Sequence, residues 1–242
     1  MTVKANMSEP DKLHHRRIRS FVRREGRLTR GQESALEELF PSIGIRLEQG
    51  MLDLGVLFGR PASSQTCRIL EIGFGNGASL VQMAQTHPEN DYLGIEVHRP
   101  GAGNLLLQME EKRLANIRIS TDDALDVMRV QIPDNSLDAV YLFFPDPWHK
   151  QRHHKRRIVQ NDFVQLVRQK LKPGGLFHLA TDWENYARQM MKVLSTAEGF
   201  ENTAGEQQYS ERPAYRPLTK FEQRGQRLGH GVWDLVFKCT LI

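Results

Sequence analysis

Acidic side chains and closely spaced glycines follow the apolar runs of this sequence, where they could hold a small ligand. These residues are Glu71, Gly73, Gly75, Gly77, Glu96 and Asp123. Glycines at alternate positions allow a tight turn that brings the backbone close to a ligand. A helix that starts directly after such a turn points its N-terminus at the same place. The pattern therefore predicts a nucleotide-type cofactor site.

The glycine loop alone leaves the class of cofactor open. Residues 73–78 also satisfy the dinucleotide pattern GxGxxG/A, since Ala78 can take the last position, and Glu96 lies where an acid binds a ribose diol. Glu71 favours a different class, because a carboxylate directly before the glycines would repel a pyrophosphate and would suit a cationic ligand. Of two neighbouring acids, Asp122 suits a helix N-cap and Asp123 is the predicted ligand contact.

A second motif is FFPDPWHK, at residues 143–150. Its two prolines hold Asp146 in a stiff turn, because proline fixes its own φ and restricts the residue before it. Asp146 is therefore the candidate catalytic residue. The basic run that follows, with Trp148 beside it, is typical of contacts to a phosphate backbone. His149 and His153 have the i, i+4 spacing of metal ligands, but neither a carboxylate nor a cysteine completes the set, so no metal is predicted.

The elements that must position these residues alternate between apolar strands and helices. Strands are predicted at 68–73, 92–97, 117–120, 137–144, 176–180 and 232–241, and helices at 78–86, 103–114, 160–171 and 183–196. This alternation predicts βαβ units and a parallel sheet with helices on both faces. In such a sheet, ligands bind beyond the carboxyl ends of the strands, so the acids above are expected at one edge.

The N-terminal part differs from the rest in charge. Of the first 30 residues, nine are Lys or Arg and three are Asp or Glu, whereas the remainder is slightly acidic. A basic arm favours a polyanionic partner, and a solubilising tail is the open alternative. A short helix is predicted near 32–40, and residues 60–64 read as a linker. We therefore expect a basic extension at 1–60 and a catalytic domain at 61–242.

Composition excludes several classes of protein. The sequence has no apolar stretch of the roughly 20 residues that a membrane helix needs, and its N-terminus lacks the apolar segment of a secretory signal. Its two cysteines, Cys67 and Cys239, form no CxxC pair, which fits a reducing compartment. We expect a cytoplasmic protein with no membrane or metal partner. Its oligomeric state is left open, with a monomer favoured.

The sequence resembles the bacterial tRNA (guanine-N7)-methyltransferases. The resemblance covers EIGFGNG (71–77), GIEVHRPG (94–101), TDDA (121–124), FFPDPWHKQRHHKRR (143–157), ATDW (180–183) and RPLTKFEQRGQRLGHGVWDL (216–235). It implies an α/β, Rossmann-like class I methyltransferase fold, with a mainly parallel seven-stranded sheet and helices on both faces. It also implies methyl transfer from S-adenosylmethionine (SAM) to N7 of a guanine in tRNA, at variable-loop position 46.

The resemblance also implies roles for individual residues. SAM contacts are expected from Glu71, Gly73, Gly75, Gly77, Glu96, Asp123 and Asp146, with Asp146 catalytic. Substrate contacts are expected from Lys150, Asp182, Thr219, Lys220, Phe221 and Glu222. RNA contacts are expected from Arg152, His153, His154, Lys155, Arg156 and Arg157. An NAD-dependent oxidoreductase, a small-molecule methyltransferase and an inactive tRNA-binding module remain the alternatives.

Overall fold

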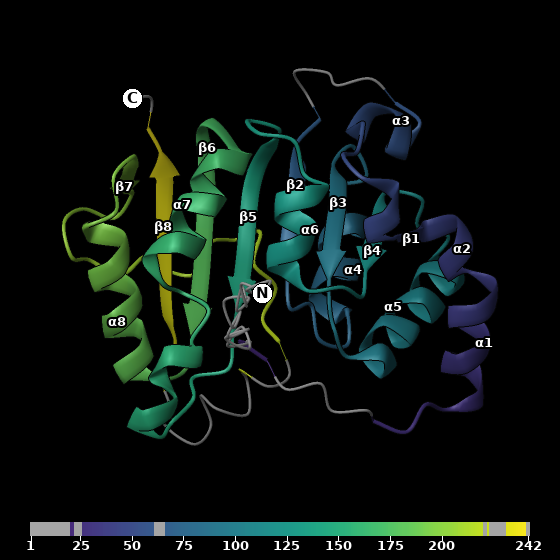
Figure 1. The fold of residues 1–242 in the computed structure, drawn as a ribbon, viewed down its shortest axis with the longest axis horizontal. Helices are drawn as coiled ribbons and strands as arrows, with labels where there is room; N and C mark the ends of the chain where they lie inside the picture. Colours follow the sequence, from purple (N-terminus) through teal and green to yellow (C-terminus); the bar gives the residue numbers. More distant parts are fainter. Residues whose placement is uncertain (1–19, 22–25, 61–65, 220–221, 223–230, 241–242) are drawn as a thin grey trace, which may run out of the picture.

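The apolar runs of the sequence assemble into one sheet. A computed structural model describes residues 20–21, 26–60, 66–219, 222 and 231–240. Within these residues the sheet has eight strands, in the order β1-β4-β3-β2-β5-β6-β8-β7 (Figure 1). The strands are β1 (Gly44–Ile45), β2 (Arg68–Ile72), β3 (Asp91–Ile95), β4 (Ile117–Ser120), β5 (Leu137–Phe143), β6 (Leu171–Thr181), β7 (Phe200–Asn202) and β8 (Trp233–Cys239). Strands β1 to β6 are mutually parallel, and β8 is antiparallel to both of its neighbours.

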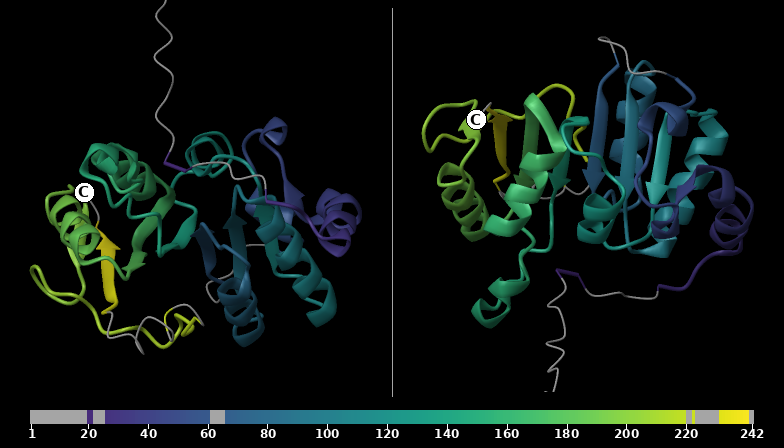
Figure 2. Two further views of the ribbon diagram at one scale, coloured as in Figure 1. Left: turned by 90° about the horizontal axis from the view of Figure 1, so that it is seen from below. Right: turned by 45° about the horizontal axis from the view of Figure 1, so that its top comes forward.

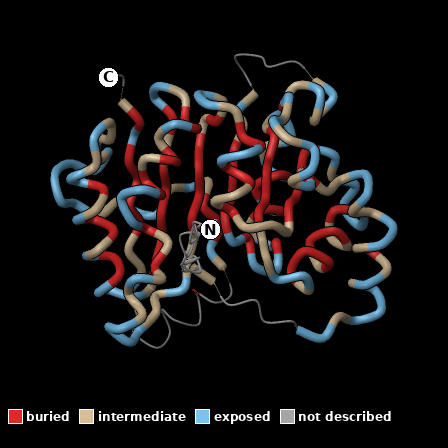
Figure 3. Tube along the Cα trace, in the orientation of Figure 1, coloured by how far each residue is buried: buried red, intermediate tan, exposed pale blue. Residues whose placement is uncertain are grey.

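Helices cover both faces of this sheet (Figure 2). They are α1 (Arg30–Glu38), α2 (Phe40–Ile43), α3 (Leu54–Phe58), α4 (Ala78–Thr86), α5 (Arg99–Lys112), α6 (Ala124–Val130), α7 (Asn161–Lys170) and α8 (Glu184–Ser195), with 3-10 turns η1 (Leu47–Gln49) and η2 (Gln151–Arg156). Side chains of α4 and α5 pack into one core, and side chains of α6, α7 and α8 pack into a second. The central strands are buried between these layers (Figure 3), which explains their near-continuous apolar sequences.

The order of the strands places a crevice at one edge of the sheet. From β2 the chain moves outward through β3 and β4, and it then returns to add β5 and β6 on the other side of β2. Helices that follow β2 and β5 therefore leave in opposite directions. Ligands bind at this reversal, beyond the carboxyl ends of the strands.

The structure confirms the predicted α/β class, and its differences from the prediction include two in the sheet. The sheet has eight strands rather than seven within the described residues, because Gly44–Ile45 of the extension pairs with β4. Strand β6 begins at Leu171 rather than at 176, since Pro173-Gly174-Gly175 forms an irregularity within the strand instead of a turn before it. The predicted division of the chain at residue 60 stays a prediction. No helix in the described part of the chain is long and apolar enough to cross a membrane.

Candidate active site

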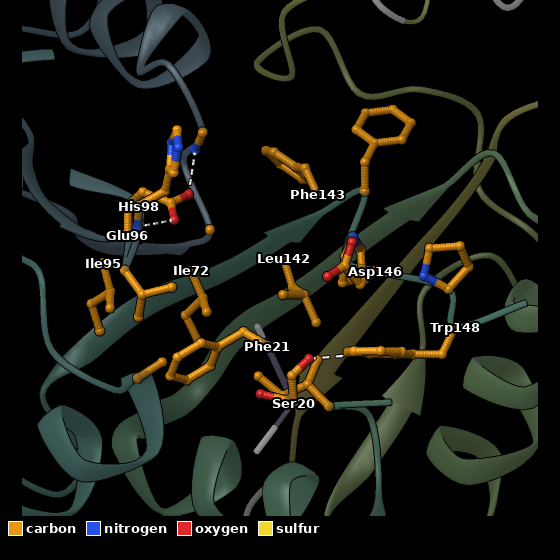
Figure 4. Close-up of a pocket in the computed structure, with 18 of the residues that line it drawn as sticks. Ser20, Phe21, Ile72, Ile95, Glu96, His98, Leu142, Phe143, Asp146 and Trp148 are labelled. Carbon is orange, nitrogen blue, oxygen red and sulfur yellow. Dashed lines mark hydrogen bonds between the residues drawn. The ribbon is translucent and has the colours of Figure 1, made fainter. Parts of the chain in front are cut away.

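A cavity of about 760 Å³ opens at the carboxyl edge of the sheet (Figure 4). This volume lies within the ~300–1,000 Å³ typical of small-molecule sites. Residues after β2, β3, β4 and β5 line it, together with a short N-terminal segment. The fold brings seven of the predicted residues to this cavity: Gly73, Gly75, Glu96, Asp123, Asp146, Lys150 and His153.

The glycine loop joins β2 to α4 with three residues in the left-handed region. Gly73, Gly75 and Gly77 have φ values of 77°, 59° and 81°, a conformation that side chains with a Cβ rarely adopt. Glu96 fixes this loop, because its Oε2 accepts a hydrogen bond from the Gly75 amide at 2.9 Å and its Oε1 accepts one from the His98 amide at 2.9 Å. The carboxylate that the sequence places at the ribose position therefore also holds the loop in shape.

Glu71 lies inside the sheet rather than on the cavity wall. It is 2% exposed, and among the described residues no hydrogen-bond partner meets its Oε2. Burial, and secondarily the charge of Glu96, raise the pKa of Glu71 from 4.5 to about 8. An unpartnered buried carboxylate is stabilised by a nearby cation, so this residue suits a positively charged ligand.

Asp123 combines the two roles that the sequence divided between neighbouring acids. It is the N-cap of α6, where its Oδ1 accepts a hydrogen bond from the Leu125 amide at 3.0 Å, and it also lines the cavity. Asp122 does not line the cavity, and its amide donates to Ser120 Oγ at 3.2 Å. The cap predicted at Asp122 is therefore formed by Asp123, which is also the acid placed to meet a ligand.

The turn that carries Asp146 is strained at both ends. Phe144 and Trp148 have φ values of 50° and 48°, and a bulky residue in this region typically costs about 1–3 kcal/mol. The Phe144 amide donates to Ala180 O at 2.7 Å, and Pro147 O accepts from Arg157 Nε at 2.8 Å. The turn is thus held from both sides, with exposed Asp146 facing the cavity.

Trp148 connects this turn to the N-terminal segment and to the basic run. Its Nε1 donates to Ser20 O at 3.1 Å, and the Arg156 guanidinium lies 4.8 Å from its ring centroid. Phe21 lines the same cavity, beside Ile72 and Leu142 (Figure 4). The sequence analysis predicts only that the N-terminal arm is basic, and it does not predict that the arm lines the cavity. Phe21, the one aromatic residue of the arm, was the feature that could have indicated this.

The basic run forms η2, which projects beyond the strand ends (Figure 2). Arg152 and Lys155 are exposed, while His153, His154 and Arg156 are half-buried. Partial desolvation and the surrounding cations lower the pKa of His153. This surface concentrates positive charge beside the cavity and suits a polyanion.

Arg157 differs from the rest of this run because it is 2% exposed. Its guanidinium donates to Pro147 O, to Gln189 Oε1 and to Asn185 Oδ1. These internal bonds join the turn that carries Asp146 to α8. They argue against the phosphate contact expected from the sequence, because the side chain would have to leave all three partners.

The predicted substrate residues fall into three groups. Lys150 lines the cavity, and Asp182 directly follows β6 at the same edge without lining it. Lys220 and Phe221 lie outside the described residues. Thr219 Oγ1 accepts from the Glu222 amide at 3.1 Å, and the buried Glu222 side chain is paired with Arg216. Sequence reasoning missed Arg216, because the sequence does not show whether an arginine is buried or exposed. Among the described residues no cluster of His, Cys, Asp and Glu could hold a metal ion.

Comparisons with known proteins give a consistent picture. Residues 65–235 match a family described as "Putative methyltransferase". The chain is 59% identical over 225 residues to a tRNA (guanine-N(7)-)-methyltransferase of Hydrogenovibrio crunogenus, covering 93% of this chain and 92% of the other. Proteins of the same name from Aeromonas hydrophila (58%, covering 98% and 99%) and Escherichia coli K12 (58%, covering 92% of each) are similar to the same degree.

Solved structures resemble the fold at low sequence identity. A 16S rRNA methyltransferase, KamB, matches with a TM-score of 0.54 and 14% identity over 74% of this chain and 90% of the other. The [4+2]-cyclase SpnF matches with a TM-score of 0.51 and 16% identity over 88% and 95%. Because these two proteins carry different activities on one fold, this likeness concerns architecture alone.

Proposed function

The chain belongs to the tRNA (guanine-N7)-methyltransferase family, and on that premise we propose that it methylates N7 of guanine 46 in the variable loop of tRNA, using SAM. The observation that carries this proposal is the row of acids around the glycine loop, with the basic surface of η2 beside it. A tRNA substrate and two unpaired cysteines fit a cytoplasmic enzyme.

The residues of the cavity fit SAM as the methyl donor. When bound, SAM supplies a sulfonium methyl group that is already activated for transfer. We propose that Glu96 binds the ribose diol, that Asp123 holds the adenine, and that Gly73 and Gly75 admit the ligand close to the backbone. Gly77, which does not line the cavity, instead leaves room for Leu105 of α5, because a Cβ at Gly77 would lie 2.7 Å from that side chain. A positively charged ligand would favour the ionised form of the buried Glu71 side chain, whose Oε2 has no hydrogen-bond partner among the described residues. In its ionised form, the same side chain would repel the pyrophosphate of a dinucleotide.

Asp146 is the proposed catalytic residue. Guanine N7 carries an in-plane lone pair, so no side chain has to remove a proton before the attack. The tasks of the protein are to align the reacting atoms and to stabilise the positive charge that develops on the purine. A carboxylate on a rigid turn at the cavity suits the second task. Asp146 could also accept hydrogen bonds from N1–H and the exocyclic amine of guanine. Adenine has no hydrogen on N1 and carries its amine at a different position, so it could not donate this pair of bonds.

The remaining contacts are assigned to the strand ends and to η2. Lys150, Asp182, Thr219, Lys220 and Phe221 are proposed to contact the guanine and its neighbours. Arg152, Lys155, Arg156 and the two histidines between them are proposed to bind phosphates of the tRNA. N7 lies within a folded tRNA, so we expect the base to leave its stack before it reaches Asp146.

Asp146→Asn tests this proposal, with Asp122→Asn as the matched control outside the cavity. Transfer of a labelled methyl group to unmodified tRNA is measured beside a transcript carrying adenine at position 46. We expect wild-type enzyme to label only the first transcript. We expect Asp146→Asn to lose about 10²–10³ in kcat, with S-adenosylhomocysteine affinity changed less than threefold. Near-normal turnover by Asp146→Asn, or equal labelling of both transcripts, would refute the assignment.

A further inference from the structure

Behind the cavity, four ionisable side chains form a buried cluster that the proposed reaction does not use. Arg216 Nη1 and Nη2 donate to Glu222 Oε2 and Oε1 at 2.7 and 2.8 Å. Its Nε and Nη2 donate to Asp234 Oδ1 and Oδ2 at 2.7 and 2.8 Å. Asp234 Oδ1 also lies 2.7 Å from His178 Nε2. Arg216, Glu222 and Asp234 are 1%, 2% and 3% exposed, and His178 is fully buried.

The charges of this cluster depend on one cation. Burial lowers the pKa of His178, so the ring is neutral and donates through Nε2 to Asp234. Burial alone would raise the pKa of Asp234, but hydrogen bonds from His178 and Arg216 bring it below its ordinary value. Arg216 is thus the single positive charge between two buried carboxylates. Two bidentate pairs use the planar fork of a guanidinium, which a lysine ammonium does not reproduce.

The cluster touches the residues that lead into the catalytic turn. The guanidinium of Arg216 lies 5.9 Å from the ring centroid of Phe143 and 5.6 Å from that of Phe144. Phe143 ends β5, and Phe144 holds the strained φ of 50° that begins the turn. Asp146 follows two residues later. Displacement of Arg216 would therefore remove the support behind the strained end of this turn.

The same cluster forms hydrogen bonds with residues 210–219, which include the predicted substrate contact Thr219. The Ser210 amide donates to Asp234 O at 2.8 Å, and Arg212 Nη1 donates to Arg216 O at 2.6 Å. The Glu222 amide donates to Thr219 Oγ1, so Glu222 is bonded both to Thr219 and to Arg216. One arginine thus connects Thr219, through Glu222, to the Asp146 turn.

We propose that Arg216 is a positioning residue for methyl transfer, and that Glu222 is its internal partner rather than a substrate contact. Arg216 holds Thr219 and the Asp146 turn in one arrangement, in which both meet the guanine. This inference rests on the proposed function. It departs from the substrate contact that the resemblance implies for Glu222, because both Glu222 carboxylate oxygens already accept hydrogen bonds from Arg216.

The test compares Arg216→Lys, Glu222→Gln and the double variant, with Arg188→Lys as the matched control. Arg188 pairs with Glu184 on the exposed face of α8, so its replacement should leave activity unchanged. Well below each melting temperature, we expect both single variants to lose about 10- to 100-fold in kcat. S-adenosylhomocysteine affinity should stay within threefold, because neither residue lines the cofactor cavity.

The double variant separates positioning from direct contact. If the two residues act as a unit, the double variant should lose no more than the worse single variant. Losses in kcat that multiply would overturn the proposal, because Glu222 would then act on substrate independently. Activity like that of Arg188→Lys in both single variants would overturn it too. Should Arg216→Lys fail to fold, Glu222→Gln decides, because it keeps the side chain's shape and the Arg216–Asp234 pair. Absence of N7 methylation by wild-type enzyme would instead refute the proposed function.

Discussion

Replacement of the buried Glu71 by glutamine should make the free protein more stable at high pH. Glu71 is 2% exposed, and the described residues offer its Oε2 no hydrogen-bond donor. Burial and the charge of Glu96 raise its pKa from 4.5 to about 8. Because the folded protein holds this proton more tightly than the unfolded chain, deprotonation favours unfolding. The penalty starts as pH rises above 4.5 and levels off above about 8.

The size of the effect follows from the two pKa values. A change from 4.5 to about 8, at about 1.4 kcal/mol for each tenfold change in equilibrium constant, corresponds to about 5 kcal/mol in full. Between pH 5 and pH 9 about 4 kcal/mol of this develops. Glutamine keeps the shape of the side chain and cannot ionise. The stability of Glu71→Gln relative to wild type should therefore rise by about 4 kcal/mol over that range.

Urea unfolding of both proteins at pH 5, 6, 7, 8 and 9 measures this difference. The exposed Glu111→Gln variant serves as the control for the loss of one carboxylate at the surface. Glu71→Gln should also bind SAM more weakly than wild type at pH 9, where the wild-type side chain is ionised and supplies a buried counter-charge to the cationic ligand. If the stability difference between Glu71→Gln and wild type is the same at pH 5 and pH 9, the assignment of a buried, proton-bound carboxylate is refuted.

Three further outcomes are expected. Gly101→Ala should destabilise the fold by about 1–3 kcal/mol in urea unfolding, because the added Cβ would overlap Gly75 O in the glycine loop. The same variant should bind S-adenosylhomocysteine more weakly in calorimetry, and unchanged binding would contradict this contact. Arg152→Ala and Lys155→Ala should each lower the salt dependence of tRNA binding by about one phosphate contact without lowering the melting temperature; an unaltered slope would exclude a phosphate contact. Arg157→Ala should instead lower the free energy of unfolding by about 2–3 kcal/mol, because the variant loses buried hydrogen bonds. A wild-type unfolding curve would count against this internal role of Arg157.

Much of the fold could be predicted because local patterns and global packing agree. The helix predicted at 78–86 and the strand predicted at 117–120 match α4 and β4, because turn residues bound each apolar run. Strand β1 could not be predicted, since two residues carry no periodicity and gain their pairing only from β4. Helix α6 escapes prediction for a similar reason: a helix of seven residues carries little periodicity, and the sequence pattern favours a cap at Asp122, one position before the true cap at Asp123.

The sequence by itself determined which residue types are available for chemistry and that parallel strands would carry them to one edge. That conclusion needs only periodicity, glycine spacing and proline stiffness, which are local properties. Tertiary structure decided which charges face solvent and which face each other. Arg152 and Arg157 are both arginines of one basic run, yet Arg152 is exposed to solvent and the buried Arg157 donates hydrogen bonds within the protein. Glu71, Glu96 and Glu222 likewise differ in burial and partners alone. Desolvation and hydrogen bonding depend on neighbours distant in the chain, so they arise only when the sheet and its helices have assembled.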